Sequence, residues 1–205
     1  MVADGQGFRA SAAAFEEYPA GTPWEPWRSW KGEANEGPLA LVRAAILSAN
    51  AFNTQPWLFK VSPTRIEMHV DYTRHLGGFD PLRREMFFSV GCSLENLMQA
   101  APANGYRPTS THYPGRFDTP SPETGSRLVA GIDLAPGPVA KSDLYLAIPH
   151  RHTDRNLFSA RAIPDAFMQR LQQEMWSFPQ VKVFTYSSAA DKKKFIDIVE
   201  TAAKT

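Results

Sequence analysis

Two short stretches of the chain carry side chains that could bind a ligand. The first, NAFNTQPWLFKV, begins at Asn50 and places two carboxamides, Asn53 and Gln55, just before a Pro–Trp pair. A carboxamide offers a donor and an acceptor together. A planar heterocycle with alternating donors and acceptors would suit such a loop. The simpler alternative is that Asn53 caps a turn and Trp57 fills the core, and spacing alone favours it.

The second stretch is HRHTDRNLF, residues 150–158. Arg151 and Arg155 are four residues apart, and the hydroxyl of Thr153 lies between them. Two guanidinium groups and a hydroxyl can hold a phosphate through charge-assisted hydrogen bonds. The alternative is a solvated basic segment with Asp154 as its counter-charge, which is the commoner case when such a segment is taken alone.

Other reactive side chains carry weaker signals. His150 and His152 have the spacing of a His-x-His ligand pair, but two cationic neighbours and the lack of a third ligand oppose a metal site, and none is predicted. Cys92 lies in an apolar helical pattern and is predicted to be a small packing residue rather than a nucleophile. No Gly-x-Gly-x-x-Gly or Walker loop indicates a separate nucleotide domain.

Composition limits the class of protein. The 205 residues are 43% hydrophobic, which suits one compact domain, or one and a part. The 22 basic and 21 acidic residues give a net charge of +1, so neither nucleic acid nor a membrane surface is favoured as a partner. One cysteine excludes an internal disulfide framework. Without a membrane-spanning run or a signal peptide at the N-terminus, we expect a cytoplasmic protein, or a periplasmic one if a signal peptide was removed.

The N-terminal 38 residues read as an irregular arm. Three tryptophans, Trp24, Trp27 and Trp30, fall in GTPWEPWRSWKGE, where the prolines disfavour a long helix. We expect the arm to cover its own core; the alternative is a substrate lid.

Helices and strands are predicted on both sides of the arginine stretch. GPLALVRAAILSAN has helical spacing with Leu39 and Val42 on its apolar face, together with Ala45 and Ile46. PWLFKVSPTRIEMHVDY predicts two strands around a turn, and RPTSTHYP, RLVAGIDLAP and VKVFTYS predict further strands. KSDLYLAIPH is a helix or a strand. A later helix begins near Pro164 with Asp165 in its first turn, and the last begins after the cap Ser188.

The strongest helix is predicted in REMFFSVGCSLENLMQAAPANGY, ending at Asn104-Gly105. Its small residues would let another backbone approach closely; these are Ser89, Gly91, Cys92 and Ser93.

Taken together, SANAFNTQPW and RHTDRNLF resemble the two signature segments of the FMN-dependent nitroreductase family. In that family an Arg-Arg-Ser-x-Arg segment holds the flavin phosphate and ribityl end, and a Pro-Ser-x-x-Asn-x-Gln-Pro-Trp loop lies against the isoalloxazine ring. The resemblance covers most of residues 39–186, and Asn53 to Trp57 is its specific part. Here the loop precedes the arginine segment in the chain, whereas in a simple nitroreductase the arginine segment comes first. This order resembles the Acg-type branch, in which two nitroreductase-like halves are fused in one chain.

The resemblance implies an α+β, nitroreductase-like fold with an antiparallel-rich central sheet flanked by helices, a fused tandem truncated in its second half. Residues 1–38 would be the arm, 39–148 the first half and 149–205 the start of the second. Family members are homodimers with the flavin between subunits, so the two halves would form one composite site, as an intramolecular pseudo-dimer or a homodimer. The residues carried over are Arg151, Thr153 and Arg155 for the phosphate and ribityl end, and Ala49, Asn50, Asn53 and Gln55 for the ring.

Three positions depart from the family pattern. Ala49 replaces the usual proline and Asn50 the usual serine. His152 stands where the second arginine would be, which reduces the positive charge that faces the phosphate. Trp57 is expected to pack beneath the loop.

The activity implied by the resemblance is FMN-dependent oxidoreduction, in which NAD(P)H reduces the flavin and the flavin reduces a nitro, quinone or similar small-molecule acceptor. The flavin carries this chemistry, so no side chain is named as a catalytic residue. Two alternatives remain: a flavin-sequestering protein with little turnover, and a flavin-free dimerisation module.

Overall fold

The computed structural model describes residues 25–28, 30, 37–113, 125–154, 156, 159, 161–176, 180–182 and 184–204. The chain divides into two compact units, Met1–Asp154 and Arg155–Thr205. The predicted boundary between two halves at residues 148 and 149 stays a prediction.

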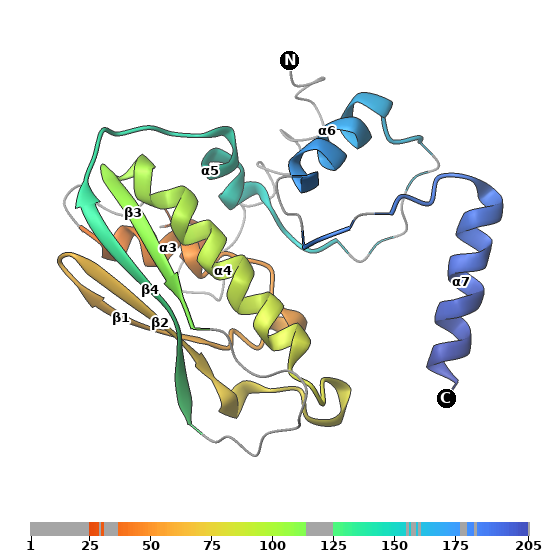
Figure 1. Cartoon of the computed structure of the whole chain (residues 1–205), viewed down its shortest axis with the longest axis horizontal. Coiled ribbons are helices and arrows are strands. Elements are labelled where there is room, and N and C mark those ends of the chain that lie inside the picture. The colour runs from red at the N-terminus through yellow and green to blue at the C-terminus, as the bar shows by residue number, and fades with distance from the viewer. Residues whose placement is uncertain are drawn as a thin grey trace. The chain divides into compact units, whose positions relative to one another are not determined.

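The first unit contains a four-stranded antiparallel sheet with the strand order β1-β2-β4-β3 (Figure 1). The hairpin β1–β2 turns at residues 63–64, as the Ser-Pro-Thr segment predicts. The register between β2 and β4 shifts between Met68 and His69. The first four predicted strands are thereby confirmed as β1 (Trp57–Ser62), β2 (Arg65–Asp71), β3 (Tyr106–His112) and β4 (Ser126–Pro136).

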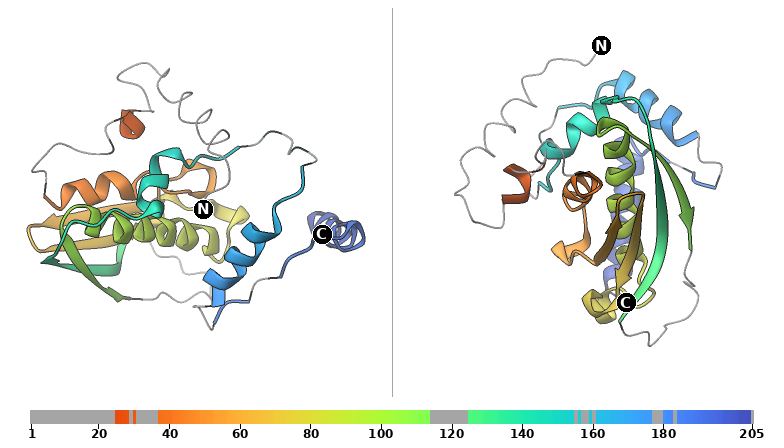
Figure 2. Two further views of the ribbon diagram at one scale, coloured as in Figure 1. Left: turned by 90° about the horizontal axis from the view of Figure 1, so that it is seen from above. Right: turned by 90° about the vertical axis from the view of Figure 1, so that its left-hand side faces the viewer.

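The two faces of this sheet differ in polarity. Alternate residues of β2, Ile66, Met68 and Val70, are fully buried. The residues between them, Glu67 and His69, are polar, and the guanidinium of Arg65 donates to Asp133 on β4 at 2.7 Å. Such alternation is typical of a strand with one buried face. The prediction put helices on both sides of the sheet; among the described residues of this unit, helices cover one face (Figure 2).

Helix α3 (Leu39–Ala45) packs on the long helix α4 (Arg84–Ala103). On α4, Ser93 is fully buried and its Oγ donates to the carbonyl of Ala45 at 3.1 Å. One turn further on, Asn96 Nδ2 donates to the carbonyl of Ala44 at 3.0 Å. These direct bonds from side chain to backbone need the close approach that the small residues of α4 predict. Gly105, with φ +80°, follows the helix as predicted.

Two predictions about helix faces are wrong. Cys92 and Gly91 are exposed, because successive helical residues are rotated by about 100° and these two lie away from the side shared by Ser89 and Ser93. On α3, Leu39 is 47% exposed rather than buried. The buried residues of α3 are two pairs that lie one turn apart: Ala40, Leu41, Ala44 and Ala45. Three of the four are alanines, which suits close contact with α4.

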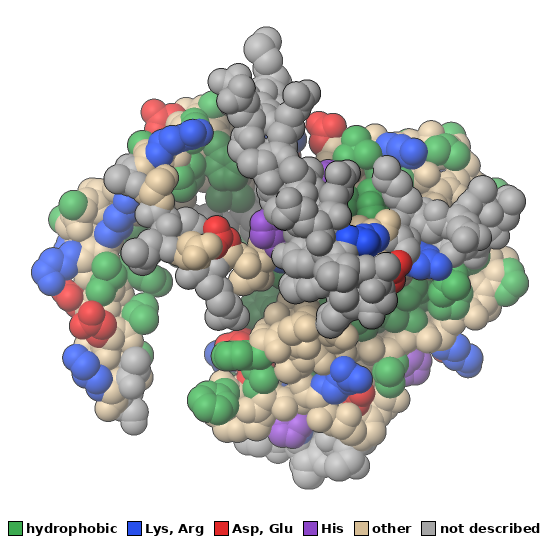
Figure 3. Space-filling view, turned by 180° about the vertical axis from the view of Figure 1, so that it is seen from behind, with side chains coloured by type: hydrophobic (Ala, Val, Ile, Leu, Met, Phe, Trp, Pro, Cys, Tyr) green, Lys and Arg blue, Asp and Glu red, His purple; other side chains and the backbone are tan. Residues whose placement is uncertain are grey.

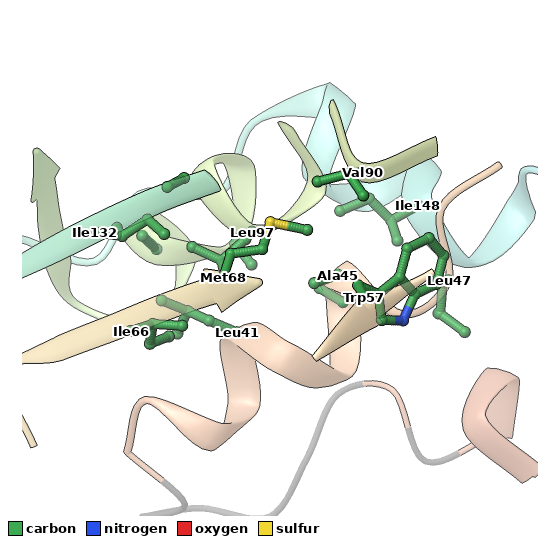
Figure 4. Close-up of a cluster of buried hydrophobic side chains, with 14 of the residues drawn as sticks. Leu41, Ala45, Leu47, Trp57, Ile66, Met68, Val90, Leu97, Ile132 and Ile148 are labelled. Atoms are coloured by element: carbon green, nitrogen blue, oxygen red, sulfur yellow. The ribbon is translucent and has the colours of Figure 1, made fainter. Parts of the chain in front are cut away.

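The core lies between the sheet and these helices (Figure 4). Trp30 from the arm belongs to it at 7% exposure, and its ring lies 5.1 Å from that of Tyr145, tilted by 53°. Burial raises the pKa of Tyr145, and a hydrogen bond with Asn104 opposes this. Trp30 thus confirms that the arm covers the core at this position. The arm's described helix, α2 (Glu25–Arg28), is short, and Trp24 lies outside the described residues.

KSDLYLAIPH is helical, which decides between the two alternatives left by its sequence. α5 (Asp143–Ala147) begins where Ser142 Oγ accepts a hydrogen bond from the backbone N–H of Tyr145 at 3.0 Å. It continues into the 3₁₀ helix η4 (Ile148–His150), which leads directly to Arg151. The other 3₁₀ helices among the described residues are η1 (Ala51–Asn53), η2 (Tyr72–Arg74) and η3 (Gly77–Phe79).

The described residues of the second unit form the helices α6 (Asp165–Trp176) and α7 (Ala189–Ala203), which confirm the predicted C-terminal helices. The predicted cap is also confirmed, since Ser188 Oγ accepts from the backbone N–H of Asp191 at 3.0 Å. The predicted strand in VKVFTYS is wrong for the described residues 181–182 and 184–187. A strand needs a partner, and the described part of this unit supplies none. No described helix in either unit is long and apolar enough to span a bilayer.

Candidate functional site

The loop between α3 and β1 has an unusual backbone. Phe52, Asn53 and Gln55 have φ of +49°, +56° and +50°. Side chains other than glycine rarely adopt this left-handed region, and such a residue costs about 1–3 kcal/mol unless the surroundings hold it. Three such residues within four positions indicate a loop whose shape is fixed by its neighbours.

Hydrogen bonds from three directions hold this loop. Asn50 Oδ1 accepts from the backbone N–H of Gln55 at 2.9 Å and closes the loop on itself. The backbone N–H of Ala51 donates to Ser89 Oγ on α4 at 3.0 Å, and Arg74 Nη1 donates to the carbonyl of Thr54 at 3.2 Å. The loop is therefore anchored to α4 and to η2 as well as to its own first residue.

The predicted ring-side residues play two different parts. Both polar atoms of Asn50 are used within the loop, since its Nδ2 also donates to the carbonyl of Ser48 at 3.4 Å. Ala49 is partly buried. Asn53 and Gln55 are exposed, and their carboxamides share a long contact of 3.5 Å. The two amides that a ligand can reach are thus Asn53 and Gln55, while Asn50 supports them.

Trp57 lies beneath the loop, as predicted. It is 7% exposed, Pro56 beside it is fully buried, and the backbone N–H of Trp57 donates to the carbonyl of Gln55 at 2.9 Å. The Pro–Trp pair therefore anchors the loop to the core, and the interpretation of Trp57 as a packing residue is confirmed.

Arg151, which is distant in the chain, contacts the start of the same loop. Its Nη2 donates to the carbonyl of Leu47 at 3.3 Å, and its guanidinium lies over the ring of Trp27 at 5.5 Å from the centroid. Arg151 Nε is buried without a hydrogen-bond partner among the described residues. Burial lowers the pKa of Arg151, and the nearby Cys92 acts in the opposite direction. Since arginine stays protonated near neutral pH, this is a partly buried cation beside the loop.

Among the described residues, no other residue predicted for the phosphate end makes a hydrogen bond to the loop. Thr153 is exposed, and so is His152, whose Nδ1 lies 3.1 Å from the carbonyl of His150. Arg155 lies outside the described residues. The structure brings Arg151 to the loop, and the assignments of Thr153 and Arg155 stay predictions.

Three supporting residues did not emerge from sequence patterns as parts of the site. Trp27 was predicted only as part of the arm, Ser89 only as a small residue, and Arg74 lies in a turn-rich segment. Ser89 is 38 positions from Ala51 along the chain, so local spacing holds no signal for that bond. Among the described residues, no group of three or more His, Cys, Asp or Glu side chains is arranged to hold a metal ion.

Comparisons with known proteins found distant relatives of one kind. No protein-family model matches the chain. It is 30% identical over 122 residues to putative NAD(P)H nitroreductases from two strains of Mycobacterium tuberculosis. Each match covers 58% of this chain and 33% of the relative, so the chain spans about a third of the length of these curated relatives. The chain is therefore a distant homologue of putative NAD(P)H nitroreductases.

Proposed function

We propose that this chain is an FMN-dependent oxidoreductase of the nitroreductase type, which uses NAD(P)H to reduce nitro, quinone or similar acceptors. The distant homology supports the class of enzyme. The observation that carries the proposal is the juxtaposition of Arg151 with the loop that presents Asn53 and Gln55. A cation and two exposed amides match a ligand that combines an anionic group with a planar polar ring.

The residues fit such a cofactor on one specific point. Arg151 Nε is a buried donor that lacks an acceptor within the described part of the chain, and a phosphate oxygen would supply one. Its guanidinium has no carboxylate partner among the described residues that would compete with the ligand. Arg151 would therefore hold the phosphate end, with Thr153 and Arg155 assigned to the same end by resemblance.

At the other end of the ligand, Asn53 and Gln55 would orient the ring through their carboxamides. FMN, when bound, supplies the electron transfer between reduced nicotinamide and acceptor. The chain's own contribution is to bind, to orient and to limit access of water, and no side chain is assigned as an acid or base. The proposal keeps the tandem, Acg-type arrangement, with the site completed in an intramolecular pseudo-dimer or a homodimer.

A second candidate is a flavin-sequestering protein. The contact between Trp27 of the arm and the Arg151 guanidinium favours it, because an aromatic arm beside the phosphate-binding cation could also cover a bound ligand. The two functions differ in turnover rather than in binding.

The test is to purify the protein, add FMN, remove free FMN by gel filtration and record the visible spectrum. The retained complex is then mixed with NADH or NADPH and a nitroaromatic or quinone acceptor. Retained flavin absorbance with multiple turnovers is the expected result. Retained flavin without turnover would favour sequestration, and a protein that retains no flavin would contradict both.

A further inference from the structure

Phe52 combines two unfavourable features at one position. Its side chain is 71% exposed, and its backbone is left-handed with φ +49° and ψ +24°. Exposing an aromatic ring forgoes hydrophobic stabilisation, and a bulky residue at positive φ is a genuine outlier. Neither feature helps the unit to fold.

The loop is nevertheless built around this residue. On one side the backbone N–H of Ala51 is held by Ser89, and on the other the carbonyl of Thr54 is held by Arg74. Thr54 Oγ1 also donates to the carbonyl of Ala51 at 3.0 Å, directly across Phe52. These bonds fix the backbone on both sides of Phe52 without burying its ring.

A ring held outward beside two exposed amides is suited to binding. Phe52 directly precedes Asn53, and Gln55 follows within the same anchored loop. Aromatic rings attract other planar rings in stacked or tilted geometries, with a free energy beyond that of area burial. With the flavin ring held by these amides, an acceptor that approaches the ring also meets the exposed phenyl ring of Phe52, which adjoins Asn53 in the chain.

We infer that Phe52 is a specificity-determining residue that contacts planar aromatic acceptors, such as nitroaromatic compounds, through its phenyl ring. The inference rests on the proposed function, which supplies the reaction in which such an acceptor is consumed. It assigns to Phe52 a role in substrate choice, not in flavin binding.

The test compares Phe52→Gly with Phe52→Tyr and with the matched control Phe79→Ala, which truncates a phenylalanine that is 88% exposed on η3. For each flavin-loaded protein, kcat/KM is measured with dinitrobenzene and with ferricyanide, an acceptor without an aromatic ring. In Phe52→Gly the ratio of the two kcat/KM values should fall about tenfold, mainly through KM for dinitrobenzene. Phe52→Tyr should keep the ratio, and so should Phe79→Ala.

A stability measurement separates substrate contact from packing. Glycine accepts positive φ without strain, so Phe52→Gly should raise Tm by about 2–4 °C while it weakens use of the aromatic acceptor. A ratio unchanged in Phe52→Gly would overturn the inference and leave the proposed function intact. A marked fall in Tm would overturn it too, because the ring would then be a packing element. Wild-type protein without flavin turnover would overturn the inference together with the proposed function.

Discussion

The two units of this chain differ in what holds them together. All buried residues of the described structure lie in Met1–Asp154, around the sheet, α3 and α4. In Arg155–Thr205 no described residue is buried, and apolar side chains lie at the surface of its helices among charged ones (Figure 3). Ten large apolar residues there are at least 40% exposed: Ile163, Phe167, Leu171, Val181, Phe184, Tyr186, Phe195, Ile196, Ile198 and Val199.

The difference shows which unit can sustain a strained site. Helices of this length draw most of their stability from tertiary packing, and none of the described side chains of α6 and α7 is buried. The loop at Phe52, by contrast, is anchored to α4, whose Leu97 and Ser93 are fully buried. Left-handed residues persist only where the surroundings over-determine them, so the first unit is where a strained binding loop can exist.

The largest expected effect comes from truncating the core of the first unit. Leu97→Ala on α4 should lower the free energy of unfolding by about 2–5 kcal/mol, because it removes a fully buried side chain and leaves a cavity. The matched change in the second unit, Leu171→Ala on α6, removes a side chain that is exposed at the surface. It should change the free energy of unfolding by about 0.5 kcal/mol or less. Denaturant unfolding followed by tryptophan fluorescence measures both. Equal losses would mean that the second unit has a core of its own.

Asp71 should show a smaller effect that depends on pH. It accepts from the hydroxyl of Thr73 at 2.6 Å and from its backbone N–H at 3.0 Å, and it pairs with Arg74, which also binds the loop at Thr54. The hydrogen bond from the Thr73 hydroxyl is the main cause that lowers the pKa of Asp71, with help from the backbone bond and from Arg74. Asp71→Asn should cost about 1 kcal/mol at neutral pH, the usual cost of losing such a cap.

The sign of the pH dependence follows from the lowered pKa. The stabilisation by Asp71 is fully present above the ordinary carboxyl pKa of 3.8 and is lost as the pH falls through the lower pKa of the folded protein. The difference in unfolding free energy between wild type and Asp71→Asn should therefore be constant from pH 7 to about pH 5 and shrink in more acidic solution. A difference that grows on acidification would contradict the assigned bonds.

The smallest effect is expected at the cap of α7. Ser188→Ala removes the acceptor for the backbone N–H of Asp191 and should reduce the helicity of α7, at a local cost of about 1 kcal/mol. Because α7 is not part of the core of the first unit, the main unfolding transition should not move. Far-UV circular dichroism measures the first effect and tryptophan fluorescence the second. A shift of the main transition would show that α7 contributes to that core.

Much of the first unit could be predicted because its signals are local. Alternation in RIEMHVD predicts β2, the small residues of α4 predict a close neighbour, and Pro56-Trp57 predicts an anchored loop. The errors come from information that is not local. Hydrophobicity put Leu39 and Cys92 inside, but the direction of each side chain depends on how α3 and α4 meet.

The anchored loop was predicted in outline, but its backbone conformation was not, for the same reason. The stretch from Asn53 to Trp57 and Arg151 were singled out by residue types and a family resemblance, whereas the left-handed backbone of Phe52 depends on Ser89 and Arg74 from distant segments. VKVFTYS has the residue types of a strand, but a strand forms only where another strand can pair with it, and composition does not report that.

The most direct test of the central claim is the Kd for FMN of the wild type, Arg151→Gln and Arg170→Gln, measured by equilibrium titration at one fixed salt concentration. Arg151 lies at the loop, whereas Arg170 lies on α6 and pairs with Glu174. The account predicts that Arg151→Gln weakens FMN binding by about tenfold or more, as expected for loss of a charge-assisted bond, and that Arg170→Gln binds like the wild type. Equal affinity of all three proteins for FMN, or no binding by the wild type, would contradict the claim that Arg151 and this loop form a flavin site.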